Sequence, residues 1–221
     1  MKLQIILLST ALVLFSQQRF DHIVRGDFFA GFSGNSQALD RAMKVTEEAL
    51  KENPNHAEAL VWHGAGLFYQ SGQLMSKNDF AKGMEFYGRG IAEMNKAVEL
   101  EPKNVGVRIP RGAVLSSGAR SMPPQMAKPL FESVIDDYYT VYQMQEKTID
   151  SLGSHPKGEL LFGLADSFSR IGATQKADFF FAMLKEKMPN TPYSKRAEIW
   201  FETKQPLPAA QAACIGCHTG K

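Results

Sequence analysis

Cysteine is scarce in this 221-residue chain, and both cysteines, Cys214 and Cys217, lie within the last eight residues. A secreted protein that uses disulfides as staples has more cysteines at scattered positions, so a disulfide framework is excluded. Charge of one sign is also lacking, because lysines and arginines are interspersed with acidic residues, form no basic run and leave a net charge of +2. The sequence therefore indicates no nucleic-acid partner.

Familiar catalytic patterns are lacking too. The sequence contains no glycine-rich phosphate loop and no recognisable serine, histidine and acid arrangement. Asp136 and Asp137 are adjacent carboxylates, but neighbouring residues on a helix diverge by about 100° and do not face one substrate. We expect both to lie on a solvated face. The sequence thus predicts no enzyme that acts without a cofactor.

Alternation of apolar and polar residues, the pattern of a half-buried strand, is absent from about residue 19 to residue 202. Apolar residues recur there at spacings of three and four, which is typical of amphipathic helices. With 44% hydrophobic residues, the chain has enough apolar surface for one sizeable core or a short solenoid. The predicted fold class is therefore all-α.

One stretch of about thirty residues has a distinctive order of small and large side chains. Its first half has an apolar residue, a small residue, an aromatic and a turn glycine, at Leu160, Ala165, Phe168 and Gly172. Its second half has a small residue, an aromatic, an aliphatic residue and a proline, at Ala177, Phe181, Leu184 and Pro189. This order resembles the tetratricopeptide repeat. The resemblance implies a pair of antiparallel helices in which small residues allow close approach and large residues fill the groove.

Earlier segments resemble the same repeat in part. Gly64 and Gly112 fit the close-packing positions of a second and a third repeat, and helix-end positions are matched by Ala42, Ala49, Pro54, Ala97 and Pro102. We therefore expect residues 19–203 to form a solenoid of about four tetratricopeptide-like antiparallel hairpins.

The second repeat is about fourteen residues longer than a standard one. A stripe of apolar residues predicts that its second helix runs from about Asn78 to Leu100 and absorbs the excess. Three glycines in this helix, Gly83, Gly88 and Gly90, each cost roughly 1 kcal/mol relative to alanine. We expect close contact with a neighbouring helix to compensate for them.

Helix starts follow from caps and prolines. Asn55 with Glu58 resembles a capping box, and Thr191 followed by Pro192 is a cap with proline at the first helical position. We expect Pro110 to begin or kink its helix, and Pro129 to open the next one. The helix after Pro192 is predicted to close the solenoid, with an apolar side formed by Tyr193, Ala197 and Trp200.

The most C-terminal motif in the sequence is Cys214-Ile215-Gly216-Cys217-His218. Two such thiols can each add across a vinyl group of haem, and the histidine can then reach the iron. The pattern resembles the attachment motif of c-type cytochromes. The resemblance implies one covalent haem c, with thioethers at Cys214 and Cys217 and His218 as an axial ligand. A thiol redox pair or a zinc site completed from elsewhere also fits the two cysteines.

Residues 204–221 read as a linker and haem-attachment tail, because Gln205-Pro206-Leu207-Pro208 has no helical pattern. So short a tail cannot enclose a haem, so we expect it to fold back on the last repeats or to lie in a partner. Either His155 or His63 is a candidate for the second axial iron ligand.

At the other end, Lys2 precedes a mostly apolar run from Leu3 to Phe15. Such a run in a helix is about 20 Å long, too short to cross a bilayer comfortably, and resembles an export signal. Residues 1–18 are thus expected to be a signal peptide or an uncleaved membrane anchor. No cysteine follows the run, so a lipoprotein signal is excluded. Export to the periplasm agrees with haem c attachment, which the cytochrome resemblance places outside the cytoplasm.

Together these features predict an exported monohaem protein that docks a protein partner, a redox protein or a membrane complex, and transfers electrons without being an enzyme. Two alternatives stay open. One is a scaffold or assembly factor for a membrane redox complex with a structural haem. The other is a sensor of small gases or peroxide, or a haem enzyme, with an open iron position.

Overall fold

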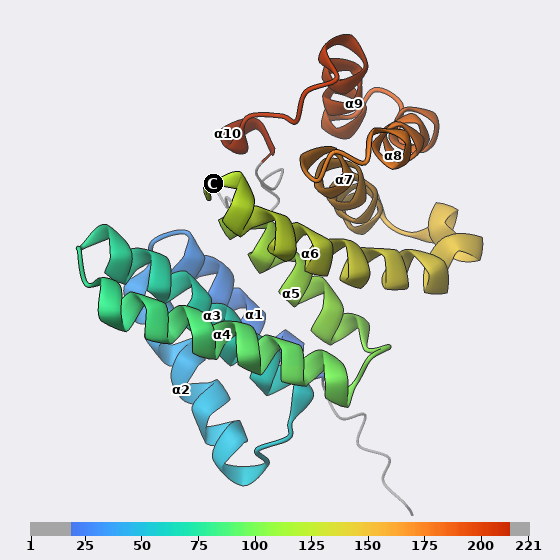
Figure 1. Cartoon of the computed structure of the whole chain (residues 1–221). Coiled ribbons are helices and arrows are strands. Elements are labelled where there is room, and N and C mark those ends of the chain that lie inside the picture. Colours follow the sequence, from blue (N-terminus) through green and yellow to red (C-terminus); the bar gives the residue numbers. More distant parts are fainter. Residues whose placement is uncertain (1–18, 213–221) are drawn as a thin grey trace, which may run out of the picture.

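The computed structural model describes residues 19–212, and in this range it contains helices and no strand (Figure 1). The predicted all-α class is confirmed. The predicted export signal and the haem-attachment motif lie outside the described residues. The elements are α1 (Phe20–Phe32), α2 (Ser36–Glu52), α3 (Ala57–Ser76), α4 (Phe80–Leu100), α5 (Val105–Ala119), α6 (Pro124–Gln145), the 3-10 helix η1 (Glu146–Ser151), α7 (Ser154–Arg170), α8 (Thr174–Lys187), α9 (Pro192–Thr203) and α10 (Ala209–Ala212).

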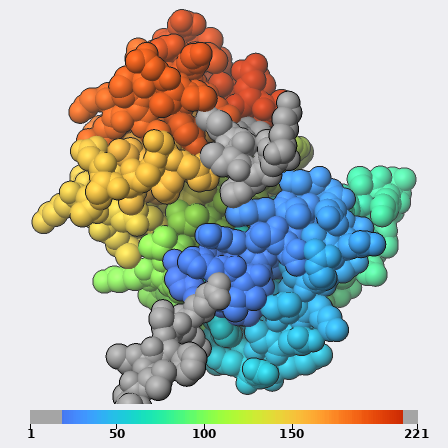
Figure 2. All heavy atoms as spheres, turned by 180° about the vertical axis from the view of Figure 1, so that it is seen from behind, coloured from blue at the N-terminus to red at the C-terminus, as the bar shows by residue number. Residues whose placement is uncertain are grey.

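Helices α1 to α8 form four successive antiparallel pairs, each stacked on the next. α1 pairs with α2, α3 with α4, α5 with α6 and α7 with α8, while α3 contacts α5 and α6 contacts α7. The view from behind shows the N-terminal helices and the last pair at opposite ends of the stack (Figure 2). Because each pair buries its apolar side against its neighbours, the core is continuous, and the helical-hairpin solenoid is confirmed.

Small residues allow the closest helix crossings. Where α3 crosses α4, a Cβ atom at Gly64 would lie 2.7 Å from the carbonyl oxygen of Gly90. Where α5 crosses α6, a Cβ atom at Gly112 would meet the ring of Tyr138. The predicted close-packing positions are therefore confirmed. A Cβ atom at Gly88, in contrast, would meet no atom of a neighbouring helix within 4 Å, so the expected compensation fails there.

Pro129 does not open its helix, contrary to our expectation. α6 begins at Pro124, whose fixed backbone angle suits the first helical position, and Pro129 lies inside the helix. Pro110 also lies inside α5, which begins earlier because the Asn104 side chain accepts a hydrogen bond from the Gly106 N–H at 2.7 Å. A side-chain cap therefore starts α5 well before its proline.

The predicted capping box at Asn55 and Glu58 is also wrong. His56 is the N-cap of α3, and its Nδ1 accepts from the Ala59 N–H at 3.2 Å. The Glu58 carboxylate instead accepts from the backbone N–H of Asp21 at 2.9 Å. Glu58 thus joins α3 to the start of α1 rather than capping its own helix.

The solenoid ends as predicted. Thr191 and Ser194 form a reciprocal capping box, with Pro192 at the first position of α9. The buried side of α9 consists of Tyr193, Ser194, Ala197 and Trp200. Among the described residues, no helix combines the length and hydropathy that a membrane span requires.

Asp137 is buried rather than solvated, which corrects the expectation for one of the two adjacent carboxylates. It is 0% exposed and accepts from Arg111 Nε at 2.7 Å and from Arg108 Nη1 at 3.0 Å. Asp136, which is 60% exposed, accepts from Arg108 Nη1 at 2.8 Å. Burial raises the pKa of Asp137 to about 6, although both guanidinium groups favour its charged form. At neutral pH the pair therefore links α5 to α6 as an ionic cluster.

Candidate functional site: the tail anchor and the pocket between α2 and α4

The chain that leads to the haem-attachment motif leaves α9 through a fixed turn. Lys204 adopts a left-handed conformation with φ of 53°, and its ammonium group pairs with Asp178. The same Asp178 carboxylate accepts from Trp200 Nε1 at 2.7 Å. Asp178, which lies on α8, therefore holds both the end of α9 and Lys204, the first residue of the tail.

Beyond this turn the tail is attached to the last hairpin. Leu207 is only 2% exposed, and its carbonyl oxygen accepts from Arg170 Nη2 at 2.6 Å. The Arg170 guanidinium also contacts the buried Asp166, which accepts from Arg120 Nε at 2.9 Å. We call Arg120, Asp166, Arg170 and Leu207 the tail anchor. It fixes the tail at the C-terminal end of α7 and beside the end of α5.

The short helix α10 continues this packing, and its last residue, Ala212, is buried. The contacts of Lys204 and Leu207 therefore attach the first part of the tail to the last hairpin, which agrees with one of the two arrangements expected for the tail. The predicted haem-binding residues Cys214, Cys217 and His218 lie outside the described residues, so for them both arrangements remain predictions.

Replacing Leu207 with alanine is expected to release the tail without unfolding the solenoid. Losing most of a buried leucine costs about 2 kcal/mol or more, which corresponds to roughly thirtyfold faster local opening. Hydrogen exchange at the Gln211 and Ala212 amides measures this, because both N–H groups donate to the carbonyl of Pro208, the residue just before α10. Gln205→Ala, at an exposed position, is the control and should leave exchange unchanged. Equal exchange in Leu207→Ala and the parent protein would show that the leucine does not hold the tail.

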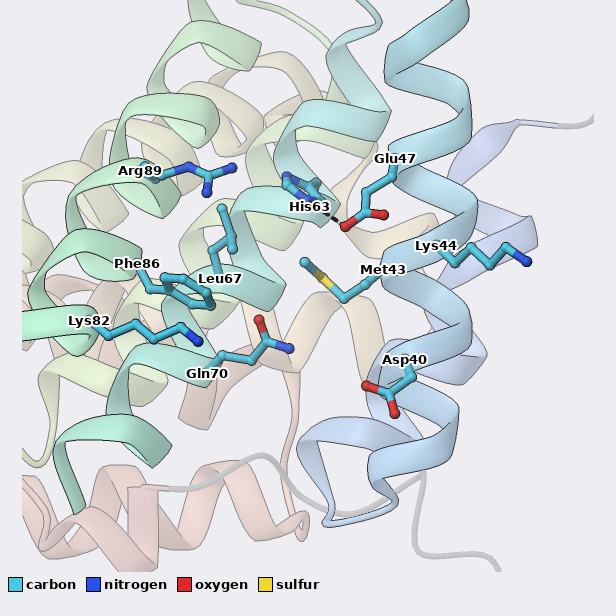
Figure 3. A pocket seen from close by; sticks show the side chains of 10 residues that line it. All are labelled: Asp40, Met43, Lys44, Glu47, His63, Leu67, Gln70, Lys82, Phe86 and Arg89. Carbon is cyan, nitrogen blue, oxygen red and sulfur yellow. Dashed lines mark ion pairs between the residues drawn. The ribbon is translucent and has the colours of Figure 1, made fainter. Parts of the chain in front are cut away.

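A second candidate site is a pocket of about 460 Å³ on the first two hairpins, seen from close by in Figure 3. We call it the α2–α4 pocket, because α2 and α4 form its walls and α3 its floor. Both walls carry charged side chains and one large apolar residue each, Met43 and Phe86, while the floor combines Leu67 with the polar His63 and Gln70. Its lining residues are Asp40, Met43, Lys44, Glu47, His63, Leu67, Gln70, Lys82, Phe86 and Arg89.

His63 is the buried polar group of this pocket, with an exposed fraction of 6%. Its Nε2 lies 3.8 Å from Oε1 of Glu47, the ion pair dashed in Figure 3. Its Nδ1 lies 2.5 Å from Oε2 of Glu93. Because an ionised carboxylate can only accept, Nδ1 carries a proton and donates to Glu93. The ring is thereby held in one orientation.

The two histidines that the sequence analysis named as candidate iron ligands lie on different helices. His155 lies in the first turn of α7 and is partly exposed, whereas His63 lies on α3. The tail anchor is at the other end of α7, because Arg170 follows His155 by fifteen helical positions, a rise of about 22 Å. The two histidines therefore belong to different hairpins.

No group of three or more histidine, cysteine, aspartate and glutamate side chains capable of holding a metal ion occurs in the described part of the chain. No protein-family model matches the chain, and neither a curated protein nor a solved structure matches it. The functional argument therefore depends on the residues themselves.

Sequence reasoning missed the tail anchor, because Arg120 and the Leu207 carbonyl are far in sequence from the Asp166 and Arg170 pair on α7. The available signal was Leu207, an apolar residue between two prolines in an otherwise polar segment. Such a residue in a linker is typical of a docking point rather than of a free chain.

Proposed function

We propose that this chain is an exported, tetratricopeptide-like protein that carries one haem c and passes single electrons to a protein partner, a redox protein or a membrane complex. The haem is attached through Cys214 and Cys217, with His218 on the iron. The observation that carries the proposal is the complete attachment motif, only seven residues beyond the buried Leu207.

The donor set fits the cofactor. Thiols two residues apart followed directly by histidine provide both thioethers and one axial ligand, and a thiol pair alone leaves His218 without a role. When bound, the haem supplies a one-electron iron centre. The tail anchor supports this proposal, because it ties the chain just before the motif to the last hairpin.

The solenoid supports the docking part of the proposal. Stacked helical hairpins produce extended surfaces on which other proteins bind. The α2–α4 pocket adds a charged recess with acidic groups from α2 and basic groups from both walls. A partner segment with charges of both signs can be recognised there through complementary contacts.

Haem staining of a denaturing gel tests the cofactor. The chain should be produced in bacteria with working cytochrome c maturation, beside Cys217→Ala. We expect a stained band from the exported fraction of the parent protein and loss of the stain in the variant, because one of the two thioethers cannot form. A colourless parent protein would overturn the proposal.

The ferrous protein's reaction with carbon monoxide distinguishes electron transfer from gas or peroxide chemistry. A six-coordinate low-spin iron that does not bind carbon monoxide supports electron transfer, and rapid binding supports an open iron position. Failure of the reduced protein to pass electrons to any co-purified partner would favour a structural haem in an assembly factor.

A further inference from the structure

We propose that the α2–α4 pocket binds a free dipeptide with apolar side chains, its terminal ammonium group at the α2 wall and its terminal carboxylate at the α4 wall. A free dipeptide carries both charges on its own termini, whereas a segment inside a partner protein would have to supply them from side chains. This inference goes beyond the proposed function and does not depend on it, because it uses described residues alone and needs no haem.

The α2 wall presents negative charge to the inside of the pocket. Asp40 and Glu47 lie about two turns apart on α2, and both side chains point toward the recess in Figure 3. Lys44, between them, is at the rim and points outward, with its ammonium group 3.9 Å from the Glu48 carboxylate and its side chain 76% exposed. This wall therefore suits the ammonium end of a ligand.

His63 adds a largely buried acceptor beside this wall. Because its Nδ1 donates to Glu93, the lone pair of the neutral ring is on Nε2. Nε2 lies 3.8 Å from Glu47, too far for a hydrogen bond, and no hydrogen bond from the described residues reaches it. Polar atoms of buried side chains favour a hydrogen-bonding partner. The ammonium group of a ligand supplies one by bridging Nε2 and the Glu47 carboxylate.

The α4 wall presents positive charge. Lys82 and Arg89 both reach into the recess from α4 (Figure 3). Arg89 also pairs with Glu85 at 4.0 Å and Glu93 at 3.8 Å on its own helix, but its side chain is 52% exposed, and exposed ion pairs of this kind are weak. A guanidinium group has five N–H donors and can hold a carboxylate through two parallel hydrogen bonds. This wall therefore suits the carboxylate end.

The spacing of the two walls favours a dipeptide over a single amino acid. α2 and α4 each pack on α3, which forms the floor between them. Because packed helix axes are about 8–10 Å apart, the charged walls are farther apart than an ammonium and a carboxylate on one carbon atom. An extended dipeptide spans about 7 Å and can reach both walls. The volume of about 460 Å³ is in the range of small-molecule sites.

The middle of the pocket fits the rest of such a ligand. Apolar side chains come from all three helices, with Met43 on α2, Leu67 on α3 and Phe86 on α4, and they can cover side chains of the size of leucine. The Gln70 amide, also on the floor, has both a donor and an acceptor for the peptide bond.

Isothermal titration calorimetry of the full-length protein with leucyl-leucine tests the proposal. We expect saturable binding with a dissociation constant of about 1 mM or tighter. Acetylation of the amino terminus or amidation of the carboxylate should each weaken binding roughly tenfold, because each removes a charged hydrogen-bonding group. Free leucine should also bind more weakly. Absence of saturable binding, or equal binding of leucine or of the peptide blocked at both ends, would overturn the proposal.

Variants of exposed side chains assign the two ends of the ligand. Glu47→Gln should weaken binding of leucyl-leucine roughly tenfold and have no further effect on the acetylated form, and Arg89→Gln should do the same with respect to the amidated form. Lys44→Gln, on the same helix as Glu47, is the control and should bind as the parent protein does. Losses that do not depend on which end is blocked would contradict the assigned orientation. None of these outcomes changes haem staining, so the two proposals are tested separately.

Discussion

Replacing Asp137 with alanine is expected to lower the free energy of unfolding by about 3–5 kcal/mol. The variant leaves the guanidinium groups of Arg108 and Arg111 buried and without the carboxylate that contacts both at 2.7 to 3.0 Å. Removing one partner of a buried ion pair is costly because the remaining charge has already lost its water. Chemical denaturation of the parent protein and the variant at neutral pH measures the difference.

Asp136→Ala is the matched control, since it removes a neighbouring carboxylate that also contacts Arg108 but is 60% exposed. Exposed ion pairs contribute up to about 1 kcal/mol, so this variant should unfold almost as the parent protein does. Equal losses in the two variants would show that burial of Asp137 does not determine the stability of the contact between α5 and α6.

Trp200→Ala should have a comparable effect at the other end of the solenoid, again about 3–5 kcal/mol. The indole is 2% exposed, stacks on Phe181 with ring centroids 5.2 Å apart, and donates to Asp178. Its removal leaves a cavity between α8 and α9 and takes away one of the donors to Asp178. Thermal or chemical unfolding followed by circular dichroism measures the loss.

Ile199→Ala provides the comparison on the same helix, because Ile199 is a large apolar residue at the surface of α9. Its replacement should change the unfolding free energy by less than about 1 kcal/mol. If both variants unfold alike, the packing of α9 against α8 contributes little to stability and does not help to hold the tail on the last hairpin.

The repeat architecture was predictable because it depends on local patterns. Apolar residues at spacings of three and four defined the helices, and Gly64 and Gly112 marked crossings where a larger residue does not fit. The long second helix of the second repeat was predicted nearly to its observed ends, Phe80–Leu100. Each of these features follows from residues close together in sequence.

The errors concern contacts between residues far apart in sequence. Glu58 forms a plausible capping box, but the backbone of α1 competes for its carboxylate. Asp137 looks solvated beside Asp136, although it follows Leu130 and Val134 on the buried side of α6. Its spacing from Val134 was the available signal, and Arg108 and Arg111, three residues apart on α5, were the partners to seek.

Only part of the candidate site was predictable from the sequence. The attachment motif is a contiguous sequence signal, so its chemistry can be proposed from five residues. The surroundings of the candidate histidines are not predictable in this way, because the contact that holds the His63 ring comes from Glu93, thirty residues away on another helix.

Mass spectrometry of the peptide that contains Cys214 to His218 tests the central claim most directly. Protein matured in cells that attach haem c should yield this peptide carrying the mass of one haem, bound through both cysteines. The unmodified mass, from cells shown to mature another c-type cytochrome, would contradict the account.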